Sequence, residues 1–186
     1  MSERPVPPRP GAAGLSSRLA AILRVDHAGE LAAVHIYRGH RAVFEAAGMT
    51  TAAGAMAELE AHEAAHLARF ETLLTEGRVR PTLMAPIWRA AAFTLGAGTA
   101  LIGEKAAHAC TEAVESVIEA HYAGQIAELT RREPALAAEL STFRDDELAH
   151  REEAVAEGAR EAPFHALLSW VVRTGCQAAI KISERV

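Results

Sequence analysis

Apolar residues recur at helical spacing along nearly the whole chain from about residue 16 onward. Alanine dominates these positions, while aromatic and β-branched residues are few, and this mixture favours helix over strand. Gly48, Gly77 and Pro134 fall where the periodic segments stop, so we expect turns there. The pattern predicts an all-α fold, with helices over about 17–47, from a cap at Thr50 or Thr51 to 76, and over 104–132 and 135–160.

Two further segments are much less polar than the rest. Thr82–Gly103 holds a single charge, Arg89, and Phe164–Ile182 is apolar at helical spacing. Basic residues flank or interrupt both segments, as in helices that lie on a membrane surface: Arg78, Arg80, Arg89, Arg173, Lys181 and Arg185. We therefore expect membrane-interfacial helices. A buried core helix is the alternative for Thr82–Gly103, whereas Pro86, Arg89 and the glycines argue against a membrane span.

The composition limits the class of protein. The 186 residues suit one domain, which we place at residues 16–186, behind a proline-rich, disordered lead-in at residues 1–15. A formal net charge of −5 gives no electrostatic support to a nucleic-acid role, so no nucleic-acid partner is expected. The run Gly96-Ala97-Gly98 lacks the third glycine and the preceding strand of a dinucleotide-binding loop, so we interpret it as close helix packing.

The chain carries two Glu-x-x-His motifs, Glu63–His66 and Glu147–His150. Each motif places a carboxylate and an imidazole one turn apart on the same helix face. About one such match is expected by chance in a chain with this many glutamates and histidines. A single motif would therefore indicate no more than a solvated helix face.

The spacing of two further glutamates changes this interpretation. Glu30 lies 33 residues before Glu63, Glu115 lies 32 residues before Glu147, and the midpoint of each interval falls near one of the turns. If each interval folds into a helical hairpin, the chain rises about 1.5 Å per residue, turns, and comes back by nearly the same distance. The motif then lies at the level of the glutamate that precedes it. Two such hairpins would gather Glu30, Glu63, His66, Glu115, Glu147 and His150 at one depth of a bundle. This is the ligand set of di-iron and di-manganese carboxylate proteins.

Metal binding would explain why four glutamates gather in an apolar bundle. Without a cation they would repel one another and take up protons, whereas two divalent metals supply about four positive charges. On spacing alone, Glu112 and Glu119 remain alternatives to Glu115. Asp146 is a candidate partner for a ligand imidazole, with a surface charge as the alternative. His62 and His66, one turn apart, could instead form a zinc-binding pair. Glu63 and the second hairpin make this alternative less favourable.

At these residues the chain resembles the demethoxyubiquinone hydroxylase family, the di-iron enzymes of ubiquinone biosynthesis, over about Ile22–Val186. The runs that carry the resemblance are RVDHAGE, EAAH, RVRPTLMAPIW, LGAGTALIGEKAAHACTEAVE, FRDDELAH and the closing ISERV. The fourth run matches the family so that Glu115, and not Glu112, takes the ligand position. His121 and Tyr122 match the family's His-Tyr pair beside the metal site. The run AVHIYRGH departs from the family in its middle residues and contains none of the six expected ligands.

The resemblance implies a ferritin-like four-helix bundle with additional apolar, membrane-interfacial helices and two iron ions per chain. The implied reaction is hydroxylation of the demethoxyubiquinol ring, using O₂ and two electrons from an unidentified donor. His121 and Tyr122 would be catalytic, relaying protons or electrons; a buried hydrogen-bonded pair is the alternative. The two apolar segments would let the ring enter the bundle while the isoprenoid tail stays in lipid.

The resemblance implies a peripheral protein on a lipid surface. The short N-terminus and the alanine- and arginine-rich composition favour the cytoplasmic face of a bacterial inner membrane, and the mitochondrial inner membrane stays open as an alternative. Protein partners from ubiquinone biosynthesis are a further expectation. A ferroxidase or iron-storage protein with the same ligand set is the alternative function, although a soluble shell has little use for two apolar segments.

Overall fold

The computed structural model describes residues 16–186, so the disordered lead-in predicted for residues 1–15 lies outside the described residues. This part of the chain is built from six α-helices and one short 3₁₀ helix, without a β-strand. The helices are α1 (Ser17–Ala46), α2 (Thr50–Gly77), α3 (Ala85–Ile102), α4 (Glu104–Leu129), α5 (Pro134–Ala156) and α6 (His165–Ser183), and the 3₁₀ helix is η1 (Ala159–Glu161). The predicted all-α fold is confirmed, and the arrangement is that of a ferritin-like helical bundle.

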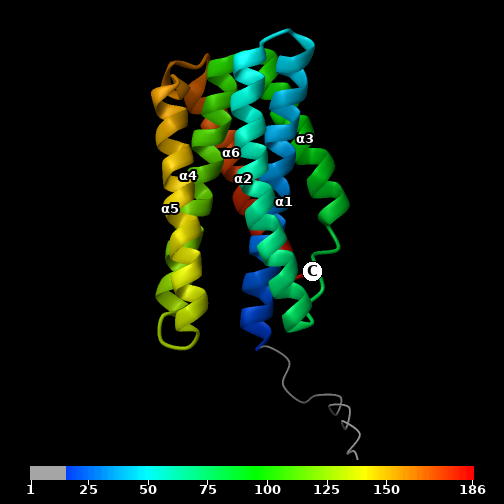
Figure 1. Ribbon diagram of the computed structural model, residues 1–186, viewed down its shortest axis with the longest axis vertical. Helices are drawn as coiled ribbons and strands as arrows, with labels where there is room; N and C mark the ends of the chain where they lie inside the picture. Colours follow the sequence, from blue (N-terminus) through cyan, green and yellow to red (C-terminus); the bar gives the residue numbers. More distant parts are fainter. Residues whose placement is uncertain (1–15) are drawn as a thin grey trace, which may run out of the picture.

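Two antiparallel hairpins form the bundle. α1 packs on α2, α4 packs on α5, and the two hairpins stand side by side in Figure 1. The side chain of Ser16 caps α1 by accepting a hydrogen bond from the backbone N–H of Leu19 (3.2 Å). Gly48, with φ of 73°, provides the left-handed backbone of the first turn. These are the hairpins that the glutamate spacing predicted.

Three helix limits differ from the prediction. The threonine cap of α2 is wrong, because Thr50 is already helical and Met49 precedes it without a side-chain cap. α4 ends at Leu129 instead of near residue 132, since the chain already turns at 130–132. α5 ends at Ala156 instead of near residue 160, because Gly158 takes a φ of 89° and the chain continues as η1.

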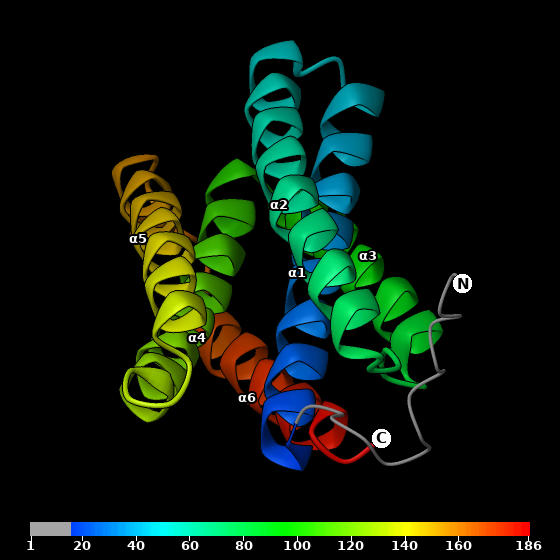
Figure 2. The ribbon, with the colours of Figure 1, turned by 60° about the horizontal axis from the view of Figure 1, so that its bottom comes forward.

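The two apolar segments form α3 and α6, which lie along the outside of the hairpins. α3 packs on α1, and α6 packs on α4 and α1 (Figure 2). A Cβ added to Gly96 would lie 2.1 Å from the backbone oxygen of Ile36, so α1 and α3 approach closely here. The packing interpretation is thus confirmed for Gly96 and wrong for Gly98, where an added Cβ would meet nothing within 4 Å. Among residues 16–186, no helix is both long and apolar enough to cross a membrane.

Candidate metal centre

Six buried side chains meet between the two hairpins. α1 supplies Glu30, α2 supplies Glu63 and His66, α4 supplies Glu115, and α5 supplies Glu147 and His150. The four carboxylates are at most 1% exposed, and the two imidazoles are 5% and 9% exposed. The structure therefore brings together all six residues that the sequence indicated as ligands.

The six side chains form two overlapping groups of four. One group is Glu30, Glu63, His66 and Glu147, and the other is Glu63, Glu115, Glu147 and His150. Within each group, one ligand atom from every residue lies within 4.8 Å of the others, which is close enough to surround one cation. Because Glu63 and Glu147 belong to both groups, two neighbouring cations would share these two carboxylates.

Buried atoms without hydrogen-bond partners mark the same place. Of the fifteen such atoms found among residues 16–186, eight belong to the centre: both carboxylate oxygens of Glu63 and Glu147, Oε2 of Glu30 and Glu115, and Nδ1 of His66 and His150. Buried polar atoms are normally paired, because leaving one unpaired costs about 1–3 kcal/mol. Carboxylate oxygen and imidazole nitrogen are ligands that divalent iron, manganese and zinc accept. The donor set therefore fits metal ions.

The crowded charges perturb the titration of the centre. Burial raises the pKa of Glu30 and Glu115 well above the usual range, and repulsion from the other carboxylates adds to it. Burial alone would lower the pKa of His66, but the neighbouring carboxylates, Glu147 first, raise it to about 12. Burial would likewise lower the pKa of His150, but the carboxylates of Glu147 and Glu63 raise it to about 10. Bound protons therefore offset part of the negative charge of the metal-free centre, and divalent cations would have to displace them.

Two buried tyrosines hold the outer glutamates of the centre. Tyr37 on α1 donates a hydrogen bond to Oε1 of Glu115 on α4, and Tyr122 on α4 donates one to Oε1 of Glu30 on α1. Each tyrosine follows the glutamate of its own helix by seven residues, two turns along the same face. Tyr37 was not among the residues predicted from the sequence. The repeated Glu-to-Tyr spacing of seven was the signal that could have revealed it.

His121 lies beside the centre and not in it. Its Nε2 is 2.8 Å from Nε2 of Gln125 and 3.6 Å from Oδ1 of Asp26. Gln125 also donates a 2.7 Å hydrogen bond to Asp26, and burial raises the pKa of that carboxyl. Successive helical residues point about 100° apart, so only Tyr122 of the predicted His-Tyr pair reaches a candidate ligand.

The two other glutamates considered on α4 face elsewhere. Glu112 lies 3.2 Å from Nε of Arg160 and 2.8 Å from Nε2 of His165. Glu119 forms an ion pair with an arginine of α5. Of the three candidates, only Glu115 points into the carboxylate cluster.

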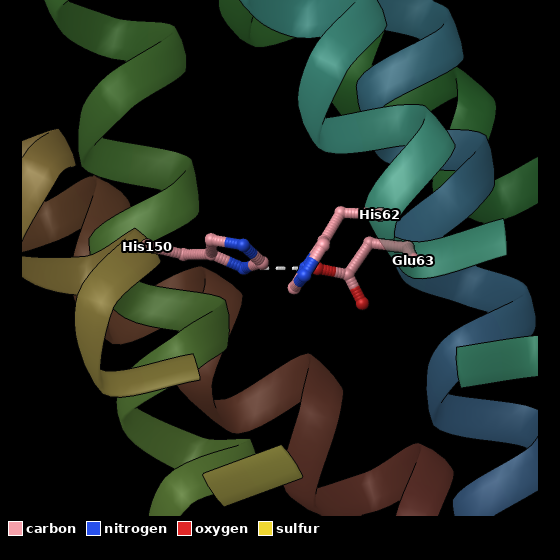
Figure 3. A group of neighbouring side chains, drawn as sticks. All are labelled: His62, Glu63 and His150. Atoms are coloured by element: carbon pink, nitrogen blue, oxygen red, sulfur yellow. Dashed lines mark ion pairs between the residues drawn. The ribbon is translucent and has the colours of Figure 1, made fainter. Parts of the chain in front are cut away.

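Two side chains border the centre where α2 faces α5. Oδ2 of Asp146 lies 3.3 Å from Nε2 of His66, the place expected of a group that orients a ligand imidazole. His62 is exposed, and its ring stands edge-on to His66 and to His150, with centroids 4.9 and 4.8 Å apart. Figure 3 shows His62 next to Glu63 on α2, with His150 reaching toward them from α5; Nδ1 of His150 is 3.0 Å from Oε1 of Glu63.

Fold and site together define a ferritin-like helical bundle with a buried carboxylate–imidazole centre that could hold metal. The family model described as "Ubiquinone biosynthesis protein COQ7" matches residues 17–183, and the chain belongs to this family. The resemblance seen in the sequence motifs is thereby confirmed.

Three relatives illustrate the similarity. The 3-demethoxyubiquinol 3-hydroxylase of Rhodospirillum rubrum is 46% identical over 186 residues, which cover 100% of this chain and 85% of the relative. The mitochondrial NADPH-dependent 3-demethoxyubiquinone 3-hydroxylase of Mus musculus is 44% identical over 168 residues, covering 88% of this chain and 76% of the relative. The mitochondrial 5-demethoxyubiquinone hydroxylase of Saccharomyces cerevisiae is 37% identical over 183 residues, covering 90% and 78%.

Proposed function

We propose that the chain is a di-iron monooxygenase that hydroxylates the ring of a demethoxyubiquinol in ubiquinone biosynthesis. The observation that carries this proposal is the pair of overlapping ligand groups that share Glu63 and Glu147. The substrate class follows from the relatives, which are named as demethoxyubiquinol or demethoxyubiquinone hydroxylases. One atom of O₂ enters the ring C–H bond and the other leaves as water, which consumes two electrons and two protons.

We assign two iron ions per chain to the centre, with Glu30, Glu63, His66, Glu115, Glu147 and His150 as their ligands. When bound, iron supplies redox electrons and coordination positions for O₂. The protein's part is to hold the ligands in place. Glu63 and Glu147 each present two oxygens without a hydrogen-bond partner, so both oxygens would be available to metal, and the two tyrosines each hold one oxygen of Glu30 or Glu115.

We assign Tyr122 the transfer of protons or electrons to the centre, because its hydroxyl touches the ligand carboxylate of Glu30. His121 would act with it from the protein surface, since its side chain is 22% exposed. Nε2 of His121 lies 3.6 Å from Oδ1 of Asp26, the buried carboxyl one turn before Glu30, and Gln125 contacts both side chains. A proton could pass directly between His121 and Asp26 without water entering the apolar bundle.

An apolar cavity of about 310 Å³ lies between α1, α3, α4 and α6. Its walls include Gly29 and Val114, the chain neighbours of Glu30 and Glu115, together with Val172 and Cys176 of α6. A cavity with this lining suits an aromatic ring and the first part of an isoprenoid tail. We propose that the demethoxyubiquinol ring binds here, next to the helices that carry the metal ligands.

The outer helices carry an exposed apolar surface. Its large side chains on and beside α3 and α6 are Leu83, Ile87, Phe93, Leu101, Ile102, Phe164, Leu167, Trp170, Val171 and Ile182, which are 39–81% exposed. Soluble monomers rarely expose large contiguous apolar patches unless they bind a partner or a membrane. We propose that this surface rests on lipid, at the cytoplasmic face of a bacterial inner membrane. The mitochondrial relatives make the mitochondrial inner membrane the alternative.

The source of the two electrons is suggested by a relative's name. The mouse relative is named NADPH-dependent, and we propose a reduced pyridine nucleotide as donor for this chain also. A groove of about 360 Å³ beside His121 is lined by Arg173 and Lys181, whose positive charges suit phosphate groups. A donor bound in this groove would lie next to His121.

Product analysis separates hydroxylation from the alternative, iron oxidation or storage. Iron-loaded protein is supplied with demethoxyubiquinol, a reductant and O₂, and the quinol fraction is examined by mass spectrometry. We expect a product that has gained one oxygen atom and protein that retains about two iron ions per chain. An unchanged quinol, with many iron atoms held in a large soluble shell, would favour storage.

A further inference from the structure

His62 occupies a position that the proposed mechanism does not use. It lies on α2 directly before Glu63 and is exposed to solvent. Its ring stands edge-on to both ligand imidazoles, with centroids 4.9 Å from His66 and 4.8 Å from His150. The imidazole therefore lies at the solvent side of the centre, and Figure 3 shows it beside Glu63 and His150.

Two sets of ligand atoms include His62. In one set it joins Glu63 and His150, which belong to the buried centre. In the other it joins His66 and Asp146, and Asp146 is 35% exposed. In both sets the ligand atoms lie within 4.8 Å of one another. His62 thus belongs both to a set that faces solvent and to a set that includes two residues of the buried centre.

The two nitrogens of His66 face different positions. Nδ1 lies 3.4–3.6 Å from carboxylate oxygens of the buried centre, and Nε2 lies 3.3 Å from Oδ2 of Asp146 on the outside. A neutral imidazole coordinates through one nitrogen while the other carries the hydrogen. His66 can therefore serve the outer set or the buried centre, but not both at once.

We propose that His62, Asp146 and Nε2 of His66 form an outer position for divalent transition-metal ions, through which the buried centre is loaded. This inference rests on the metal centre of the proposed function. A cation first binds where His62 and Asp146 meet solvent. The cation then moves inward when His66 binds it through Nδ1 instead of Nε2. His62 still lies within reach of Glu63 and His150. Imidazole and carboxylate suit Fe²⁺, Co²⁺ and Zn²⁺ alike.

The order of affinities follows from the same geometry. The buried centre offers four carboxylates and two imidazoles to two ions. Once it is filled, His66 is engaged through Nδ1, so the outer position keeps only His62 and Asp146 as strong ligands. We expect the protein to bind two Co²⁺ ions tightly and a third ion more weakly.

Titration of metal-free full-length protein with Co²⁺, followed by calorimetry and visible absorption, counts these ions. His62→Gln removes the imidazole and keeps a good helix former. His35→Gln is the matched control. His35 lies on α1, its ring is hydrogen-bonded to the backbone carbonyl of Leu31, and it belongs to no ligand set found in the described chain. The parent and the control should bind two tight ions and one weaker ion, and His62→Gln only the two tight ones.

Stopped-flow mixing with Co²⁺ tests the loading role. His62→Gln should fill the two tight positions about tenfold more slowly than the parent. The final occupancy of these two positions should be the same in both proteins. A third ion retained by His62→Gln, no third ion in the parent, or an uptake rate equal to the parent's would each overturn the proposal. Failure of the parent to bind any Co²⁺ would instead overturn the metal centre itself, and this inference with it.

Discussion

Tyr122 on α4 donates its hydroxyl hydrogen to Glu30 on α1, and both side chains are at most 1% exposed. The reciprocal bond from Tyr37 to Glu115 makes the two hairpins nearly equivalent around the centre. Each bond occupies one carboxylate oxygen and leaves the other without a hydrogen-bond partner. The pair thus provides a matched comparison, because the two tyrosines hold proposed ligands in the same way and only Tyr122 adjoins His121.

Replacing each tyrosine with phenylalanine separates holding a ligand from relaying protons or electrons. Tyr37→Phe and Tyr122→Phe should each lower metal affinity about 10–100-fold, because a ligand carboxylate loses the group that orients it. Turnover per bound pair of iron ions should fall only in Tyr122→Phe. Calorimetric metal affinity and product formation normalised to bound iron are the measurements. Equal turnover per iron pair in the two variants would remove the relay role of Tyr122.

Glu115 and Glu112 lie one turn apart on α4 but face different surroundings. Glu115→Ala should reduce bound iron below that of the parent and abolish hydroxylation, because one of the six proposed ligands is lost. Glu112→Ala breaks contacts with Arg160 and His165 and should leave the iron content unchanged. Iron is measured by elemental analysis of the purified proteins. Equal loss in both variants would show that the ligand on α4 is wrongly assigned.

Metal binding should release protons. The pKa values of about 12 for His66 and about 10 for His150 keep both imidazoles protonated near pH 7 in the metal-free protein, so binding of two divalent ions should expel these two protons. The raised pKa values of Glu30 and Glu115 favour further proton release in the same direction. Lower pH favours the protonated groups, and the apparent affinity should fall about tenfold per pH unit for each proton released. Calorimetry in buffers of different ionisation enthalpy measures the number of protons released on metal binding. Affinity independent of pH between 6 and 8 would contradict the proton-filled centre.

A charge on the exposed apolar surface should separate metal chemistry from quinol chemistry. Leu101 is 75% exposed on α3, so Leu101→Asp should leave iron binding intact and weaken contact with lipid. Turnover of a long-tailed quinol in vesicles should fall steeply, while a short-tailed soluble analogue should be little affected. Thr142→Asp, which adds the same charge to an exposed position of α5, is the control. Equal loss on both substrates with iron retained would exclude the membrane role.

Much of the site was predictable because helices have a fixed rise and a fixed period. The separations of Glu30 from Glu63 and of Glu115 from Glu147 determine where each pair meets once a hairpin forms, so the buried cluster could be anticipated. The spacing says nothing about which side chains cross from one hairpin to the other, and for this reason Tyr37 was overlooked.

Local sequence was also a poor guide where tertiary contacts decide the outcome. Gly96 and Gly98 look alike in the sequence, but only Gly96 faces the backbone of α1. His121 and Tyr122 are adjacent in the chain, yet the rotation of the helix sends one toward Asp26 and the other toward Glu30. The helix phase relative to its neighbours, which depends on the packed structure, decides both cases.

We propose that one oxygen atom of O₂ reaches the demethoxyubiquinol ring at the carboxylate–imidazole centre. The most direct test is a reaction of iron-loaded protein with this quinol, a reductant and isotopically labelled O₂, followed by mass spectrometry of the product. We predict that the new ring hydroxyl carries the label and that Glu63→Ala, which removes a shared carboxylate, forms no product. Unlabelled oxygen in the hydroxyl, or an unchanged quinol in the presence of two bound iron ions, would contradict the claim.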